Sequence, residues 1–168
     1  MTSPPGRTES LASNGGDHAR QERVARDSLV EALQELLEAE RAGAKVAVNM
    51  IAAATDAGAI AFAGRVRETE VRWCRMLTQA LRRLGAEPRL VVGDFAARLL
   101  ALEDDEARLS LLVRGNAWVV RKLEAVLPQI GDEGLRSSLE AMRQEHLESI
   151  ERTQQRLATL AVSRSQAD

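Results

Sequence analysis

Four segments of this sequence repeat apolar residues at alternating spacings of three and four positions, the spacing that places side chains on one face of an α-helix. Helices that cross at shallow angles in a bundle bury such a face as a continuous seam. Residues that favour strands are scarce, because Tyr is absent and aromatic residues make up only 2% of the chain. We therefore predict an all-α fold, an antiparallel four-helix bundle.

Turn, capping and helix-breaking residues divide the chain into the expected elements. The predicted long helices cover residues 21–54, 59–84, 105–127 and 133–160, with a short extra helix over 94–102 in the connection between the second and third. Residues 1–20 are rich in Ser, Gly and Pro and are expected to form a disordered tail. Residues 21–160 would then form one domain, and 161–168 a frayed end. The direction of the long connection stays open.

The charge pattern limits the classes of partner. Basic and acidic residues number 23 and 25 and are spread along the chain, so no field is expected that would attract nucleic acid or an anionic membrane. No apolar run approaches the ~20 residues of a membrane span. The single Cys74 agrees with a reducing compartment. We expect a cytoplasmic protein without a nucleic-acid or membrane partner, and a homodimer stays open.

One polar residue interrupts each apolar seam: Glu40, Glu70, Asn116 and His146 in the four helices in turn. In the first helix the seam positions are Leu29, Leu33, Leu36, Glu40, Gly43, Ala47 and Met50. Counting along the sequence, Glu40 and Glu70 both lie 15 positions from residue 55 in the first turn, and Asn116 and His146 both lie 15 positions from Gly131 in the second. At ~1.5 Å per residue, all four would lie about 22 Å from their turns. The spacing predicts one polar layer at midheight.

This layout, two helical hairpins with a long middle connection, midheight carboxylates and a histidine, resembles the ferritin-like superfamily, which includes bacterioferritins and rubrerythrins. The resemblance covers residues 28–160. The segments LLEAERAGAK, EVRWCRML and NAWVVRKLEAVLP look like a bacterial branch of these proteins and imply no particular activity. In the superfamily, a Glu from each of two helices and a Glu-x-x-His from each of the other two bind a pair of iron or manganese ions.

Carried over by position, the resemblance implies that Glu40 is similar to the first-helix ligand, Glu70 to the Glu of the second-helix motif and His146 to the fourth-helix histidine. Three residues depart from the motif. Trp73 replaces the histidine that would follow Glu70, Asn116 lies near the expected third-helix Glu, and Arg143 stands where the Glu before His146 belongs.

Two carboxylates and one imidazole remain, with Asn116, Arg143 and Trp73 expected around them. This set could hold a single Fe, Mn or Zn ion weakly.

Three environments stay open for the two carboxylates: solvated helix faces, a buried salt-bridge network with Arg143 or Arg114, or a bound metal ion. A buried charge needs compensation, which arginine or a metal can supply. Two functions follow. One is a ferritin-like redox or metal-handling protein with iron or manganese at Glu40, Glu70 and His146. The other is a metal-free helical interaction or structural module. Whether the chain is an enzyme stays open.

Overall fold

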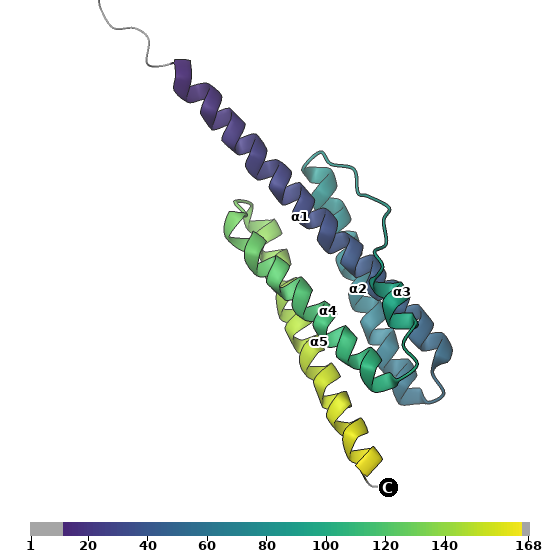
Figure 1. Ribbon diagram of the computed structural model, residues 1–168. Helices are drawn as coiled ribbons and strands as arrows, with labels where there is room; N and C mark the ends of the chain where they lie inside the picture. Colours follow the sequence, from purple (N-terminus) through teal and green to yellow (C-terminus); the bar gives the residue numbers. More distant parts are fainter. Residues whose placement is uncertain (1–11, 166–168) are drawn as a thin grey trace, which may run out of the picture.

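The computed structural model describes residues 12–165, which form four long helices and two short elements (Figure 1). In chain order these are α1 (Ala12–Ala53), α2 (Ala57–Arg83), α3 (Phe95–Leu100), α4 (Asp105–Val126), the 3-10 turn η1 (Leu127–Gln129) and α5 (Glu133–Ser165). The predicted all-α fold is confirmed, including the short extra helix.

Local hydrogen bonds explain where α2 and α4 begin and end. The carboxylate of Asp56 accepts the backbone N–H of Ala59 at 2.8 Å, and that of Asp104 accepts the N–H of Ala107 at the same distance. The α2 helix ends at Arg83, and Gly85, the residue after its C-cap Leu84, has a φ of 70°, which suits a residue without a side chain. Pro128 lies within η1, which closes α4.

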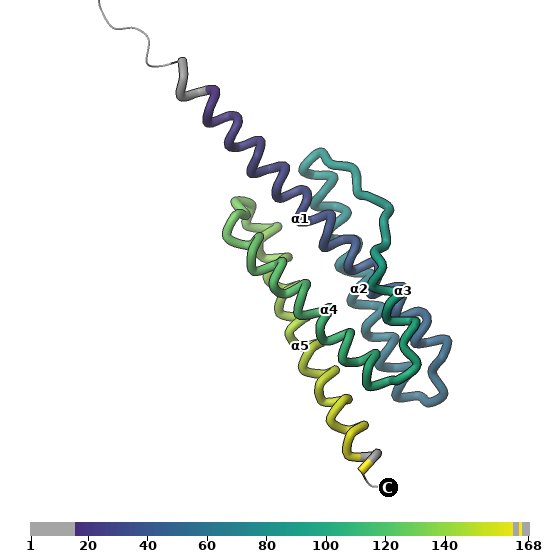
Figure 2. Tube along the Cα trace, viewed as in Figure 1, coloured from purple at the N-terminus to yellow at the C-terminus, as the bar shows by residue number. Residues whose placement is uncertain are grey.

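The long helices form two hairpins, α1 with α2 and α4 with α5, each packed more extensively than the two hairpins are packed against each other. Lys122 of α4 bonds to Glu35 of α1, whereas Gly115, earlier in α4, lies beside Phe95 near the later part of α1. The α4 helix is therefore antiparallel to α1 and parallel to α2. The connection from α2 to α4 consequently crosses the length of the bundle, as the tube in Figure 2 shows.

A buried glutamine fastens this crossover to α1. The side-chain amide of Gln34 donates to the carbonyl of Glu87 at 2.8 Å, and its oxygen accepts the N–H of Arg89 at 2.9 Å. Arg89 also pairs through its side chain with Glu31. The crossover is therefore held along α1 by paired polar groups.

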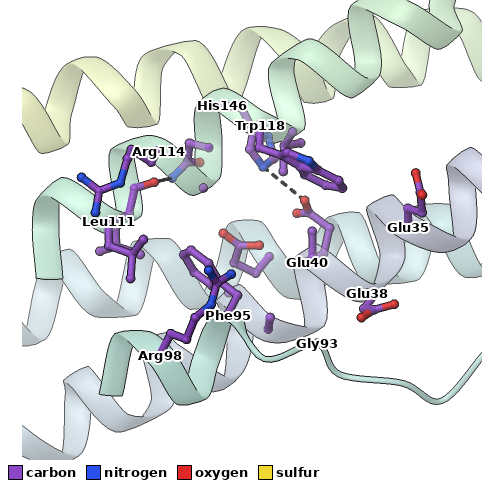
Figure 3. A pocket seen from close by; sticks show the side chains of 18 of the residues that line it. Glu35, Glu38, Glu40, Gly93, Phe95, Arg98, Leu111, Arg114, Trp118 and His146 are labelled. Atoms are coloured by element: carbon purple, nitrogen blue, oxygen red, sulfur yellow. Dashed lines mark hydrogen bonds and ion pairs between the residues drawn. The ribbon is translucent and has the colours of Figure 1, made fainter. Parts of the chain in front are cut away.

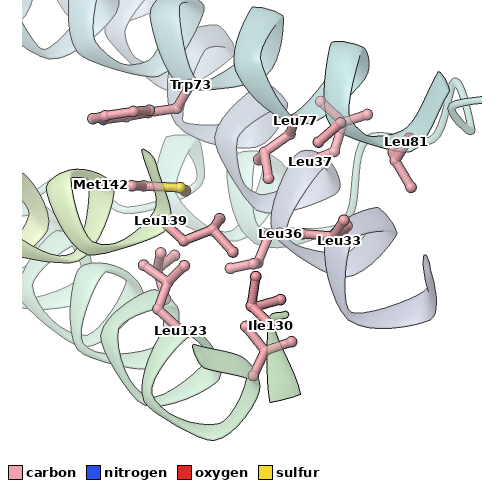
Figure 4. Close-up of a cluster of buried hydrophobic side chains, with 13 residues drawn as sticks. Leu33, Leu36, Leu37, Trp73, Leu77, Leu81, Leu123, Ile130, Leu139 and Met142 are labelled. Carbon is pink, nitrogen blue, oxygen red and sulfur yellow. The ribbon is translucent and has the colours of Figure 1, made fainter. Parts of the chain in front are cut away.

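Two clusters of buried apolar side chains fill the bundle. The larger (Figure 4) consists of Leu33, Leu36, Leu37, Trp73, Leu77, Ala80, Leu81, Val119, Leu123, Val126, Ile130, Leu139 and Met142. The smaller, which includes residues of α3, consists of Ala42, Val46, Ala96, Leu99, Leu109 and Leu112. The gap between the two clusters is where the polar residues lie.

The outer helices extend further than the sequence pattern indicated. The α1 helix begins at Ala12, so residues 12–20, predicted to be disordered, are helical; the rest of that predicted tail, 1–11, lies outside the described residues. Residues 16–28 are exposed, so this extension depends on helical hydrogen bonds rather than on the core. The α5 helix likewise continues to Ser165. None of the helices in the described range is long and apolar enough to cross a membrane.

Candidate metal centre

Glu40 of α1, Glu70 of α2 and His146 of α5 meet between the two apolar clusters. Each offers a ligand atom, and these three atoms lie within 4.8 Å of one another. Their side chains are enclosed, since Glu40, Glu70 and His146 are only 0%, 8% and 2% exposed. Equal spacing from the turns predicted that these three residues share one level of the bundle, and in the structure they lie together there.

The His146 ring is oriented by its own helix. Its Nδ1 lies 2.9 Å from the backbone carbonyl of Met142, and because a carbonyl only accepts hydrogen bonds, Nδ1 carries the hydrogen and donates it. The other nitrogen, Nε2, lies 3.2 Å from Oε1 of Glu40 (Figure 3). A carbonyl that fixes one ring nitrogen in this way leaves the other directed at the ligand position.

The two carboxyl groups are enclosed without a matching cation. Neither oxygen of Glu40 accepts a hydrogen bond from an N–H or a hydroxyl group of the residues that the structure describes. A protonated Glu70 carboxyl would be the one neighbouring donor. Burial raises the pKa of Glu40 to about 8, against the smaller lowering effect of that hydrogen bond from Glu70. Burial also raises the pKa of Glu70 well above its usual range, and the neighbouring charge of Glu40 raises it further. Such a pair requires either protons or a bound cation.

Gly43 of α1 makes room for Glu70. A Cβ atom at position 43 would lie 2.5 Å from Cδ of Glu70 and 2.6 Å from its Oε2, closer than real Cβ atoms approach other atoms. The sequence pattern placed Gly43 on the seam but missed this role. The sequence nevertheless held one indication of this role: Gly43 lies in the interior of a helix, where glycine is less favourable than alanine.

Glu145, which the sequence pattern did not single out, adds a third acidic group nearby. It pairs with Arg72 and accepts a hydrogen bond from the Thr69 hydroxyl at 3.2 Å. Its charge contributes to the raised pKa values of Glu40 and Glu70, after burial. The sequence held one indication of Glu145: it directly precedes His146, the histidine of the polar layer.

The salt-bridge alternative is wrong for both arginines that were considered. Arg143 bonds to Glu124, through Nε at 3.0 Å and Nη2 at 2.8 Å, rather than to Glu70. Arg114 is exposed and forms no ion pair with any described residue. The solvated-face alternative is also wrong, because both carboxyl groups are buried.

Asn116 and Trp73 are the two other residues that were expected around the centre, and each contacts other parts of the fold. Asn116 is at the level of the centre, but its amide donates to the carbonyl of Leu112 in its own helix at 2.9 Å. Trp73 is buried in the larger apolar cluster, and its Nε1 has no hydrogen-bond partner among the described residues.

The donor set fits one transition-metal ion. Carboxylate oxygens suit manganese and iron, and a neutral imidazole nitrogen suits iron and zinc. The unbonded oxygens of Glu40 and the oriented Nε2 of His146 are free to face such an ion. The set lacks ligands that the superfamily uses for a pair of ions, because Trp73, Asn116 and Arg143 stand where further carboxylates and an imidazole would be expected.

The arrangement of the helices defines a protein with the ferritin-like fold. A crystal structure described as ferritin like, diiron-carboxylate proteins from Bacillus anthracis str. Ames matches with a TM-score of 0.70, over 79% of this chain and 97% of that one. The two sequences are 17% identical, so the likeness shows the fold alone.

More particularly, the chain belongs to the family described as Domain of unknown function (DUF6306), which matches residues 27–155. The matched range contains all three residues of the centre. No curated protein matches the sequence.

Proposed function

We propose that this protein binds one divalent iron or manganese ion through Glu40, Glu70 and His146. The observation that supports the proposal most strongly is the enclosure of two carboxyl groups and a directed imidazole nitrogen within 4.8 Å. A divalent ion would balance both carboxylate charges, which no arginine among the described residues does. The similar Bacillus anthracis protein, which is described as diiron-carboxylate, supports iron.

An ion at this position would supply Lewis acidity and, for iron or manganese, redox chemistry. The chain's own residues would each have a different role. Glu40 and Glu70 would balance the charge, the Met142 carbonyl holds the His146 ring by its Nδ1, and the two apolar clusters limit water on either side along the bundle. Glu145, paired with Arg72, maintains negative charge near the centre. These parts support a metal-handling protein without specifying a reaction.

Metal analysis of protein purified without an affinity tag tests this proposal. We expect close to one iron or manganese ion per chain, lost in Glu40→Ala and retained in Glu68→Ala, a change at an exposed glutamate of α2. Purified wild-type protein that neither contains nor takes up these metals would refute the proposal.

A metal-free structural or interaction module is the second candidate. The 3.2 Å contact between Glu40 and His146 favours it, because a protonated Glu40 carboxyl can donate to Nε2 and close the centre without an ion. Such a module could act as a homodimer in the cytoplasm, where the lone Cys74 would remain reduced. Light scattering of the metal-free protein tests the dimer.

A further inference from the structure

A cavity of about 560 Å³ leads from the candidate centre toward solvent between α1, α3 and α4. Glu40, Glu70 and His146 lie at its inner end, and the buried Glu40 carboxyl, which accepts no hydrogen bond from an N–H or hydroxyl group of the described residues, faces into it (Figure 3). Small-molecule pockets in proteins typically have volumes of ~300–1000 Å³. The cavity is therefore large enough for an organic ligand as well as an ion.

The walls of this cavity are largely apolar and include Phe95, Leu111 and Trp118. The Phe95 ring lies against the backbone of α4, where a Cβ on Gly115 would come within 2.7 Å of Cζ. Glycine at position 115 thus allows α3 to place an aromatic ring beside the cavity. The apolar part of an organic ligand would therefore contact apolar side chains in this cavity.

The charges around the opening favour an anion. Three of the charged side chains that line the cavity are already paired: Glu35 pairs with Lys122, and Arg98 pairs with Asp94. Glu38 also lines the cavity and forms no ion pair with a described residue, so it adds one negative charge at the opening, where it contributes to the raised pKa of Arg89 after the larger contribution of that residue's hydrogen-bonded partner Glu31.

Arg114 and Arg121 line the same opening and form no ion pair with any residue that the structure describes. Their charges would attract an anion and disfavour a cation.

We propose that the cavity binds a small carboxylic acid with an apolar body, its carboxylate directed toward the Glu40, Glu70 and His146 end. The body contacts Phe95, Leu111 and Trp118, and Arg114 and Arg121 attract the anion at the opening. This orientation rests on the proposed function, because a bound ion gives the ligand carboxylate a positive partner beside two protein carboxylates.

Full-length protein loaded with Co²⁺ provides the test, with benzoate and hexanoate as probes and benzamide as the uncharged control. The visible absorption of Co²⁺ reports ligation, and calorimetry reports affinity. We expect both acids to bind and change the Co²⁺ spectrum, with benzamide roughly tenfold weaker or more, because the carboxylate is the group that meets the ion.

Three variants locate the binding. Leu111→Trp fills the cavity and should abolish the benzoate response while retaining Co²⁺, and Leu111→Phe serves if the larger residue prevents folding. Arg114→Gln should weaken benzoate roughly two- to fivefold, the effect of one exposed charge. Arg67→Gln, at an exposed arginine of α2 outside the cavity, should leave affinity unchanged.

The outcomes separate this inference from the proposed function. Failure of wild-type protein to bind Co²⁺ would overturn both. Co²⁺ binding with no response to either acid, with benzamide equal to benzoate, or with full benzoate binding in folded Leu111→Trp and Leu111→Phe would overturn the carboxylic-acid pocket alone.

Discussion

The backbone of Gly43 on α1 lies directly against the carboxyl group of Glu70 on α2, in the space that a side chain at position 43 would occupy. This contact joins the two helices of the first hairpin at the level of the candidate centre. Glu70 can reach Glu40 and His146 because the facing helix presents no Cβ atom there.

Gly43→Ala should therefore displace Glu70. We expect a loss of roughly 1–3 kcal/mol in the free energy of unfolding, as for other overpacked interior sites, together with weaker metal binding. Gly64→Ala is the matched control, because a Cβ at this α2 position meets nothing within 4 Å and should be neutral or stabilising by about 1 kcal/mol or less. Chemical denaturation measures both, and equal stability of the two variants would show that the contact at Gly43 is unimportant.

Burial of Glu40 makes the stability of the metal-free protein depend on pH. The native pKa is raised to about 8 from an ordinary value of 4.5, so between these values the native state keeps a proton that the unfolded state has lost. The free energy of unfolding should accordingly fall as pH rises from about 4.5 to about 8, by at most ~1.4 kcal/mol per pH unit for this proton.

Denaturation curves with a chelator present, recorded across this pH range, measure the slope. Glu40→Gln should reduce it, whereas Glu68→Gln should not. A wild-type protein whose stability is flat or rises over the range would rule out a protonated Glu40.

Arg143 and Glu70 should act independently. Because Arg143 bonds to Glu124 at a partly exposed position, Arg143→Gln should change the free energy of unfolding by less than about 1 kcal/mol. The double change with Glu70→Gln should be additive within ~0.5 kcal/mol. Thermal melts of the two single variants and the double variant decide this, and a coupling well above that value would place Arg143 at the centre after all.

Gln34 should stabilise the crossover. Gln34→Ala leaves the carbonyl of Glu87 and the N–H of Arg89 without their side-chain partner, so we expect a loss of roughly 1–3 kcal/mol. Hydrogen exchange at the Arg89 amide should become faster. Gln144→Ala, at an exposed position of α5, is the control, and unchanged exchange in Gln34→Ala would mean that other contacts hold the crossover.

Sequence spacing predicted the height of the polar residues well, because helix rise is constant and Glu40, Glu70 and His146 could be counted from their turns. It also predicted the helices to within a few residues, apart from the exposed beginning of α1 and end of α5. Those ends lack apolar periodicity, so the pattern could not define them.

Other features depended on tertiary structure. The direction of the crossover is set by where Gln34 meets Glu87 and Arg89, residues far apart in sequence. The partner of Arg143 depends on the rotation of α5 against α4, which seam spacing does not fix to better than about one residue. The role of Gly43 emerges only when α1 and α2 are placed against each other.

Anomalous X-ray diffraction from crystals grown with Mn²⁺ tests the central claim most directly. We predict one anomalous peak per chain, bounded by Glu40, Glu70 and Nε2 of His146. Crystals that show no peak there, a peak only elsewhere, or two adjacent peaks would contradict a centre built for a single ion.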